Sequence, residues 1–279
     1  MATSHTQQVS GAARSALFVP ASRPERIPKA LASGADVIIV DLEDAVEANA
    51  KDTARDALAA FLDGNPEAGI LVRINGVGTP EHDADLAMCN ARSGVAGIML
   101  PKTESAAHVQ AVAAGGKPVW PIVETAAAML ALGEITRASG IARIAFGSLD
   151  FGLDLGLNQN SEAALALLDH ARCQILLHSR AAGLAAPLDG VHAAISDTDG
   201  LQRYAQRARD LGFGGMLCIH PSQVAAVHAA FAVSEKELAW ARSVVQEAER
   251  TGLAAFRLDG EMVDAPVIGR AREILARAA

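Results

Sequence analysis

Residues 37–46 read VIIVDLEDAV, and this stretch does more than any other to decide the fold. It opens with four apolar residues in a row, whereas a strand exposed on one face would alternate apolar and polar residues. Continuous apolar runs are typical of parallel strands that are buried on both faces. The run ends in Asp41, Glu43 and Asp44, so we expect a polar site at the carboxyl end of this strand.

Similar short apolar segments recur along the chain. The predicted strands are Ala16–Pro20, Val37–Asp44, Gly69–Asn75, Gly97–Lys102, Pro118–Glu124, Ile141–Asp150, Ala185–His192 and Gly214–Pro221. Helix-length segments separate most of them, at residues 24–33, 50–62, 105–114, 125–139, 162–182 and 201–211. This alternation without a break in composition predicts an α/β fold of the (β/α)₈ TIM-barrel type. An open doubly wound sheet is the alternative, but no Gly-x-Gly-x-x-Gly follows the first strand.

The composition excludes several classes of protein. Of the 279 residues, 51% are hydrophobic and 20% are charged, which argues against disorder and against a coiled coil. The net charge of −8 argues against a nucleic-acid partner. No apolar run reaches the ~18–20 residues that span a bilayer, so we expect no membrane partner. The scattered Cys89, Cys173 and Cys218 suit a reducing compartment, and we expect a cytoplasmic protein.

The C-terminal part of the chain departs from this alternation. Ser234 and Glu237 form a capping box before an amphipathic helix, and residues 256–258 and 261–263 predict a small hairpin. A final helix is expected after Pro266. We therefore divide the chain into a flexible N-terminal tail (1–13), a barrel (14–225) and a C-terminal helical and hairpin extension (226–279). The extension exceeds what a barrel needs, so we expect it to cover an edge of the site or to dock on a neighbouring subunit.

Charged or polar residues end most of the predicted strands. In a β/α barrel the carboxyl ends of the strands converge on one mouth, where the chemistry takes place. Core packing does not explain charges there, because a buried unpaired charge is costly. The residues concerned are Asp41, Glu43, Asp44, Arg73, Asn75, Lys102, Glu124, Asp150, Asp189, His192 and His220.

Glu124 and Asp150 are the candidate metal ligands. They end adjacent predicted strands, so we expect their carboxylates to meet at the mouth. Mg²⁺ is typically held by one or two carboxylates together with waters and substrate oxygens. His192 and His220 stand alone in the sequence, so a hard cation with oxygen ligands is favoured over zinc.

Arg73 and Lys102 bring positive charge to the same mouth. The fork of donors on Arg73 suits a bidentate grip on a substrate carboxylate. An ion pair with Asp41, Glu43 or Asp44 is the alternative role for this arginine. Lys102 is a Schiff-base candidate, but its neighbours predict no apolar lysine pocket, so we favour a salt bridge. A serine hydrolase is set aside because no Gly-x-Ser-x-Gly elbow is present.

A set of motifs runs from about Arg14 to the C-terminus in a fixed order: RSALFVP, VIIVDLEDAV, LVRIN, GIMLPKT, PIVET and LDGEMVDAPVI. Together they resemble the CitE-like branch of the HpcH/HpaI aldolase family, which includes citrate lyase β subunits, malyl-CoA lyases and citramalyl-CoA lyases. The resemblance implies a (β/α)₈ barrel in a homotrimer or hexamer. It also implies Mg²⁺ at the mouth, with Mn²⁺ as the alternative ion.

The resemblance also implies roles for individual residues. Glu124 in PIVET and Asp150 in FGSLDF match the metal-binding carboxylates, and Arg73 in LVRIN matches the arginine that binds the substrate carboxylate. Asp264 in EMVDAP resembles the acid/base aspartate that reaches a neighbouring protomer's site. Two departures alter the pocket lining: Leu149 stands where glutamate is common, and TAAAML follows the metal glutamate where glycine or proline is common.

These roles imply a Mg²⁺-dependent carbon–carbon lyase. It would cleave or form a 3-hydroxyacyl thioester, such as citramalyl-CoA, malyl-CoA or a citryl thioester, by aldol or Claisen-type chemistry. Supporting residues would be Asp41, Glu43, Asp44 and Lys102 around the metal waters and Arg73, with Arg23, Arg26 and Lys29 as candidate contacts to CoA phosphates. A carrier-protein thioester would instead require the partners of a citrate lyase complex. The alternatives are a metal-dependent pyruvate aldolase without a thioester, and a non-catalytic subunit that binds CoA or an organic acid.

Overall fold

The strands of this computed structural model, which describes residues 12–158 and 161–278, close into a barrel. In chain order they are β1 (Ser15–Pro20), β2 (Val37–Asp41), β3 (Ile70–Arg73), β4 (Val95–Leu100), β5 (Val119–Val123), β6 (Arg143–Phe146), β7 (Ala185–Asp189) and β8 (Gly215–Cys218). Each pairs in parallel with the next, and β8 pairs back to β1 with Met216 opposite Ser15. The predicted (β/α)₈ barrel is therefore confirmed, and the open sheet is excluded.

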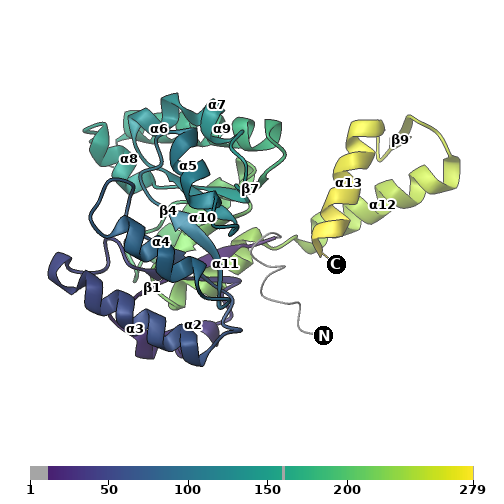
Figure 1. Ribbon diagram of the computed structural model, residues 1–279. Coiled ribbons are helices and arrows are strands. Elements are labelled where there is room, and N and C mark those ends of the chain that lie inside the picture. The colour runs from purple at the N-terminus through teal and green to yellow at the C-terminus, as the bar shows by residue number, and fades with distance from the viewer. Residues whose placement is uncertain (1–11, 159–160, 279) are drawn as a thin grey trace. The chain divides into compact units, whose positions relative to one another are not determined.

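Helices cover the outside of this barrel (Figure 1). They are η1 (Pro24–Arg26), α2 (Ile27–Leu31), η2 (Ala48–Ala50), α3 (Lys51–Gly64), α4 (His82–Asn90), α5 (Ala106–Ala113), α6 (Ala126–Leu130), α7 (Leu132–Ile135), α8 (Ser148–Asp154), α9 (Glu162–Ala181), α10 (Thr198–Asp210) and α11 (Ser222–Phe231). Polar caps start several of them: Ser105, Thr125 and Ser161 each accept the backbone N–H three residues later. Within the described residues, no helix is long and apolar enough to cross a membrane.

The predicted strand over 141–150 is wrong at its end. β6 stops at Phe146, and Asp150 lies in α8. The carbonyl of Gly147 accepts the N–H of Phe151, which begins the helix directly after the strand. The apolar run does not reveal this change, because a short run has no period that separates a strand from a buried helix. Asp150 therefore comes from the first turn of a helix.

The barrel interior is filled by apolar side chains from successive strands. Val37, Ile39, Leu71, Trp120 and Leu188 belong to one buried cluster, and burying each such side chain contributes about 1.5–3 kcal/mol. This packing fills the barrel interior with side chains. Most of the predicted tail lies outside the described residues, but Ala13 is buried in this same cluster.

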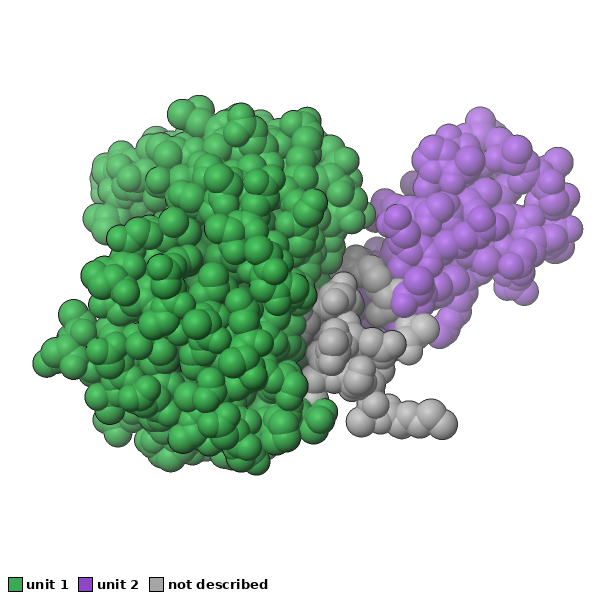
Figure 2. All heavy atoms as spheres, viewed as in Figure 1, with its two compact units in different colours: residues 1–230 green, residues 231–279 purple. Residues whose placement is uncertain are grey.

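Residues 231–279 form a second compact unit, distinct from residues 1–230 (Figure 2). It contains α12 (Glu235–Thr251), β9 (Phe256–Leu258), β10 (Glu261–Val263) and α13 (Ala265–Ala278). The predicted capping box and hairpin are present. Asp259 and Gly260 both adopt positive φ, at 51° and 87°, as a two-residue hairpin turn requires. The predicted barrel boundary at 225 falls within α11.

Candidate active site at the barrel mouth

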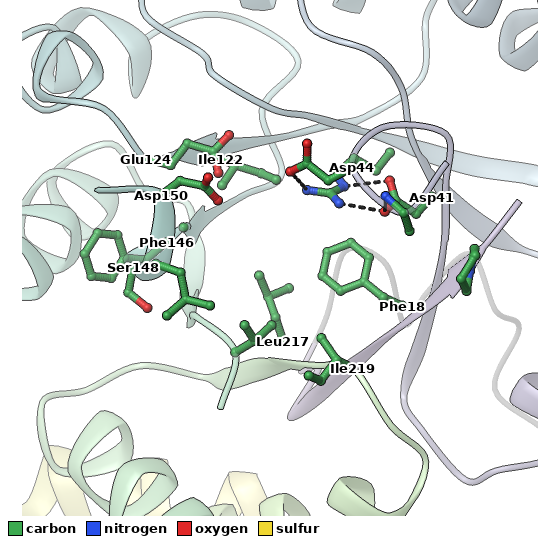
Figure 3. A pocket seen from close by; sticks show the side chains of 16 residues that line it. Phe18, Asp41, Asp44, Ile122, Glu124, Phe146, Ser148, Asp150, Leu217 and Ile219 are labelled. Atoms are coloured by element: carbon green, nitrogen blue, oxygen red, sulfur yellow. Dashed lines mark hydrogen bonds and ion pairs between the residues drawn. The ribbon is translucent and has the colours of Figure 1, made fainter. Parts of the chain in front are cut away.

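A cavity of about 370 Å³ opens where the strands end (Figure 3). Figure 3 shows Asp41, Asp44, Glu124 and Asp150 along one side of this cavity and Leu217 and Ile219 along the other. Arg73 also lines it. The cavity thus has a charged side and an apolar side, and five of the predicted site residues meet there.

Arg73 is held from three directions at the end of β3. Its Nε and Nη2 donate to the two carboxylate oxygens of Asp41 at 2.8 and 2.6 Å, and its Nη1 lies 2.8 Å from Glu43 Oε2. Its guanidinium carbon stands 4.8 Å from the centre of the Phe18 ring. Burial disfavours the charge, but Asp41, Glu43 and Asp44 outweigh burial and raise the pKa of Arg73. The ion pairs considered as an alternative role are therefore present, and they fix a permanently charged guanidinium at the cavity wall.

Arg73 has more N–H donors than these ion pairs use. A guanidinium carries five N–H bonds. Asp41 takes two of them and Glu43 faces a third, while Asp44 Oδ2 is 3.7 Å from Nη1. Two N–H bonds remain for a ligand oxygen, so the structure allows Arg73 to hold its partners and bind a carboxylate at once.

Lys102 lies two residues after the end of β4 and joins two acidic groups. Its backbone N–H donates to Glu124 Oε1 at 2.7 Å, and its Nζ lies 2.5 Å from Glu43 Oε1. Lys102 adopts φ of 47°, in the left-handed region. Burial lowers the pKa of its ammonium, but Glu43 outweighs burial and raises it. Lys102 is therefore a charged salt-bridge partner, and the geometry disfavours a Schiff-base role.

Glu124 is buried at the end of β5, with only 2% of its surface exposed. Burial first, and then the charges of Asp150 and Glu43, raise its pKa to about 7, although the Lys102 N–H opposes the rise. Gly147 makes room for it, because a Cβ there would lie 2.3 Å from Glu124 Oε2. Two acidic groups therefore face one another at the mouth where burial penalises negative charge.

This arrangement fits a hard divalent cation. The donors are carboxylate oxygens, which Mg²⁺ prefers. A cation would offset both the cost of burying the charge and the repulsion from Asp150 and Glu43, which together raise the pKa of Glu124. Among the described residues, no group of three or more His, Cys, Asp or Glu side chains gathers at a metal position. Glu124 and Asp150 would supply two carboxylates to such an ion and leave its other coordination positions to water and substrate.

Sequence reasoning missed the residues that hold the acidic loop after β2. Lys51 Nζ donates to the carbonyls of Leu42 and Glu43 at 2.9 and 2.6 Å, and to Asn75 Oδ1 at 2.8 Å. Asn75 Nδ2 in turn donates to Asp85 at 2.6 Å. Lys51 carries no motif that would have identified it. Its three bonds fix the backbone on which Glu43 stands.

The remaining predicted residues lie elsewhere. Arg26 and Lys29 line an adjoining cavity of about 390 Å³ together with His220, whereas Arg23 is exposed and lies 3.9 Å from Glu25. Asp264 belongs to the second unit, where it is exposed and accepts the N–H of Val267. The structure thus brings together the residues of the barrel mouth and leaves Asp264 on a separate unit.

Comparison with known proteins extends these observations. The family described as HpcH/HpaI aldolase/citrate lyase matches residues 14–221, and that described as C–C bond lyase of the TIM-barrel fold matches residues 169–279. A citrate lyase subunit beta-like protein of Mycobacterium tuberculosis (strain H37Rv) is 43% identical over 268 residues, which cover 94% of each chain. A (3S)-malyl-CoA thioesterase of Cereibacter sphaeroides is 35% identical over 274 residues, covering 95% of this chain and 94% of that protein.

Solved structures agree with these matches. Protein CitE of M. tuberculosis, in complex with magnesium, acetoacetate and coenzyme A, superposes with a TM-score of 0.85 at 40% identity. The superposition covers 96% of this chain and 99% of that one. RipC of Yersinia pestis matches with a TM-score of 0.68 at 30% identity, over 81% and 98% of the two chains.

Proposed function

Since the chain belongs to the HpcH/HpaI aldolase/citrate lyase family, we propose that it is a Mg²⁺-dependent carbon–carbon lyase acting on a 3-hydroxyacyl thioester. Citramalyl-CoA, malyl-CoA and a citryl thioester are the proposed substrates. The observation that carries the proposal is the buried Glu124, whose pKa is raised to about 7 beside Asp150, close to a charged Arg73. Such a site suits a divalent ion and an oxygen-rich acid.

Glu124 and Asp150 would hold the metal. When bound, Mg²⁺ supplies a Lewis acid that stabilises negative charge on the substrate oxygens next to the reacting bond. The proposal is supported by the related CitE structure, which contains magnesium together with acetoacetate and coenzyme A. Mn²⁺ is the alternative ion, because it too prefers oxygen ligands.

Arg73 would bind and orient the substrate carboxylate. Its two remaining N–H bonds are available at the cavity wall, and Asp41 and Glu43 keep its plane fixed. Donors that are already in place cost little reorganisation when charge develops during the reaction. Asp44 and Lys102 complete the charged surroundings, Asp44 near Arg73 and Lys102 against Glu43 and Glu124.

Asp264 would act as the acid/base group. In cleavage, the 3-hydroxyl of the thioester would lose its proton to water and become a carbonyl, and the electron pair of the breaking C2–C3 bond would stay on C2. Asp264 would then give a proton to C2 of the released acyl thioester. In condensation it would remove that proton. We propose that a neighbouring copy of the chain supplies Asp264 to each mouth, within a homotrimer or hexamer, and that docking is the purpose of the C-terminal unit.

The CoA portion would extend from the mouth into the adjoining cavity. Arg26 and Lys29 line that cavity and would contact its phosphates, with Arg23 nearby in the chain as a third candidate. A carrier-protein thioester, as in a citrate lyase complex, would use the same mouth. Its phosphopantetheine arm would not need the adenosine contacts.

Product analysis tests the proposal. We expect malyl-, citramalyl- or citryl-CoA to release acetyl-CoA in the presence of Mg²⁺, and Glu124→Ala to abolish that release. If none of the thioesters is cleaved, the lyase assignment is wrong. Release of free CoA would instead assign thioester hydrolysis, the activity for which the C. sphaeroides relative is named. Turnover of pyruvate with an aldehyde, unaffected by CoA esters, would assign the aldolase alternative.

A further inference from the structure

Asp150 is a proposed metal ligand that its own contacts do not fix. Within the described residues, its carboxylate takes part in no hydrogen bond or ion pair. Its helix, α8, has only 7 residues, and no side chain caps the helix at Gly147. The direction of the Asp150 carboxylate therefore depends on whatever holds the first turn of α8.

Ser148 is the anchored residue of that turn. It is 5% exposed, and its Oγ lies 3.1 Å from the hydroxyl of Tyr204 on α10. Residues two positions apart on a helix are rotated by about 200° and point to opposite sides. Ser148 held on one side therefore turns Asp150 to the other. In Figure 3 the Asp150 carboxylate lies beside Glu124, and the Ser148 hydroxyl points away from it.

A buried ion pair fixes the Tyr204 hydroxyl in turn. Arg172 Nη2 donates to it at 2.6 Å, and Arg172 Nε lies 2.9 and 3.1 Å from the two carboxylate oxygens of Asp189. Asp189 ends β7, is fully buried, and also accepts the N–H of Gly190 at 2.8 Å. Because Arg172 can only donate, the Tyr204 oxygen accepts from it, and the Tyr204 proton is left for Ser148.

The pKa of Tyr204 agrees with a hydrogen bond in which Tyr204 donates to Ser148. Burial raises the pKa of Tyr204 to about 12, and the charge of Asp189 adds to the rise. The phenol therefore keeps its proton at neutral pH and remains a donor. The chain of bonds runs from the end of β7 through Arg172 and Tyr204 to the start of α8.

We propose that Tyr204 is a positioning residue, through which the Asp189–Arg172 pair holds Ser148 and thereby aims Asp150 at the metal position. The inference rests on the proposed function, in which Asp150 binds Mg²⁺. It assigns a task to three polar residues that do not line the mouth: the buried Arg172 and Asp189 and the half-buried Tyr204.

Two measurements on the full chain test this role. One is the dissociation constant for Mg²⁺ by titration calorimetry, and the other is hydrogen exchange of the α8 amides in the metal-free protein. Ser148→Ala removes the bond between Ser148 and Tyr204, and Tyr204→Phe removes that bond together with the one from Arg172. Each variant should weaken Mg²⁺ binding about 3- to 10-fold. Both should speed exchange in α8. The double variant should bind Mg²⁺ no more weakly than Tyr204→Phe alone, because Tyr204→Phe already removes the bond to Ser148.

Two matched variants test whether Mg²⁺ affinity falls because Asp150 is displaced or because the whole protein is less stable. Ser148→Thr keeps the hydroxyl and should bind Mg²⁺ as the wild type does. Ser15→Ala removes an equally buried serine, whose Oγ lies 2.8 Å from His228 Nε2 at the other end of the barrel. It should lower the melting temperature without changing Mg²⁺ affinity. Wild-type affinity in Tyr204→Phe, or equal weakening in Ser15→Ala, would overturn the inference.

Asp150→Asn separates a failure of the proposed metal site from a failure of the proposed positioning role of Tyr204. If this variant binds Mg²⁺ as tightly as the wild type, the proposed metal site is wrong. If it loses Mg²⁺ while Tyr204→Phe does not, the metal site stands and the positioning role of Tyr204 is wrong.

Discussion

Arg73 combines observed structural contacts with a proposed role in substrate binding. Its contacts with Asp41 and Glu43 explain why it is fixed, and its two remaining N–H bonds explain what it can bind. A lysine in its place would keep the charge but not the planar fork. The geometry of the donors, rather than the charge alone, should therefore determine activity.

Arg73→Lys tests this distinction. We expect kcat/KM to fall by roughly 100-fold, the usual cost of losing a donor that is already in place. Arg92→Lys is the matched control, because Arg92 makes a comparable two-bond contact with Asp63, at 2.9 and 3.1 Å, away from the mouth. Steady-state kinetics give the kcat/KM of both variants for comparison. Equal losses would mean that the fork at residue 73 has no special role.

Glu124 makes metal binding depend on pH. Its pKa is raised to about 7, first by burial, so below that pH a proton competes with the metal. Mg²⁺ affinity should therefore increase as the pH rises through about 7, with a proton released on binding. Calorimetry in buffers of different ionisation enthalpy measures both quantities, and Glu124→Gln should remove the dependence. Equal Mg²⁺ affinities at one pH unit below and one pH unit above this pKa would contradict the expectation.

The same shift affects the stability of the metal-free protein. A carboxyl group whose pKa is raised by folding binds its proton more tightly in the folded state. Its contribution therefore becomes unfavourable as the pH rises from the ordinary glutamate value toward about 7. Saturating Mg²⁺ should reverse this loss, because the ion stabilises the ionised form.

At the scale of elements, the junction between β6 and α8 sets the spacing of Glu124 and Asp150, the two proposed metal ligands. β6 ends at Phe146, Gly147 passes close to Glu124, and α8 begins at Ser148. A side chain at Gly147 would meet both the Cβ and Oε2 of Glu124, at 2.5 and 2.3 Å. The absence of a side chain there is thus a requirement of the site.

Gly147→Ala should displace Glu124 and weaken Mg²⁺ binding by at least about 10-fold. Gly152→Ala is the control within α8 itself, because a Cβ there meets nothing within 4 Å. It should leave Mg²⁺ affinity unchanged and stabilise the helix by about 0.5–1 kcal/mol. Calorimetry and urea unfolding give the two readouts. An unchanged Mg²⁺ affinity in Gly147→Ala would show that Glu124 does not need this space.

At the scale of the whole molecule, the barrel and the C-terminal unit have separate cores. Phe256, Val263 and Ile268 pack with α12 residues in a cluster of their own. The proposed metal ligands lie in one unit and the proposed acid/base residue in the other. If residues from two copies of the chain complete each site, two different inactive variants should regain activity when they are mixed.

Complementation between inactive variants tests this. Glu124→Ala lacks a metal ligand, and Asp264→Asn lacks the acid/base group. If Asp264 comes from a neighbouring copy, mixing the two variants through partial denaturation and reassembly should create some intact sites. We expect measurable lyase activity in the mixture and none in either variant alone. An inactive mixture whose hetero-oligomers are verified by mass spectrometry would place Asp264 in its own copy's site.

The sequence by itself determined the parallel barrel, the hairpin of the C-terminal part and the acidic groups at the strand ends. These features depend on local patterns, since a buried strand, a turn and a cap are each specified by a few neighbouring residues. Only the tertiary structure decided that Asp150 belongs to a helix, that Lys51 holds the loop after β2, and that Tyr204 reaches Ser148 from 56 residues away. The contact between Tyr204 and Ser148 joins distant parts of the chain, and all three features depend on burial and hydrogen bonding that exist only after the barrel closes.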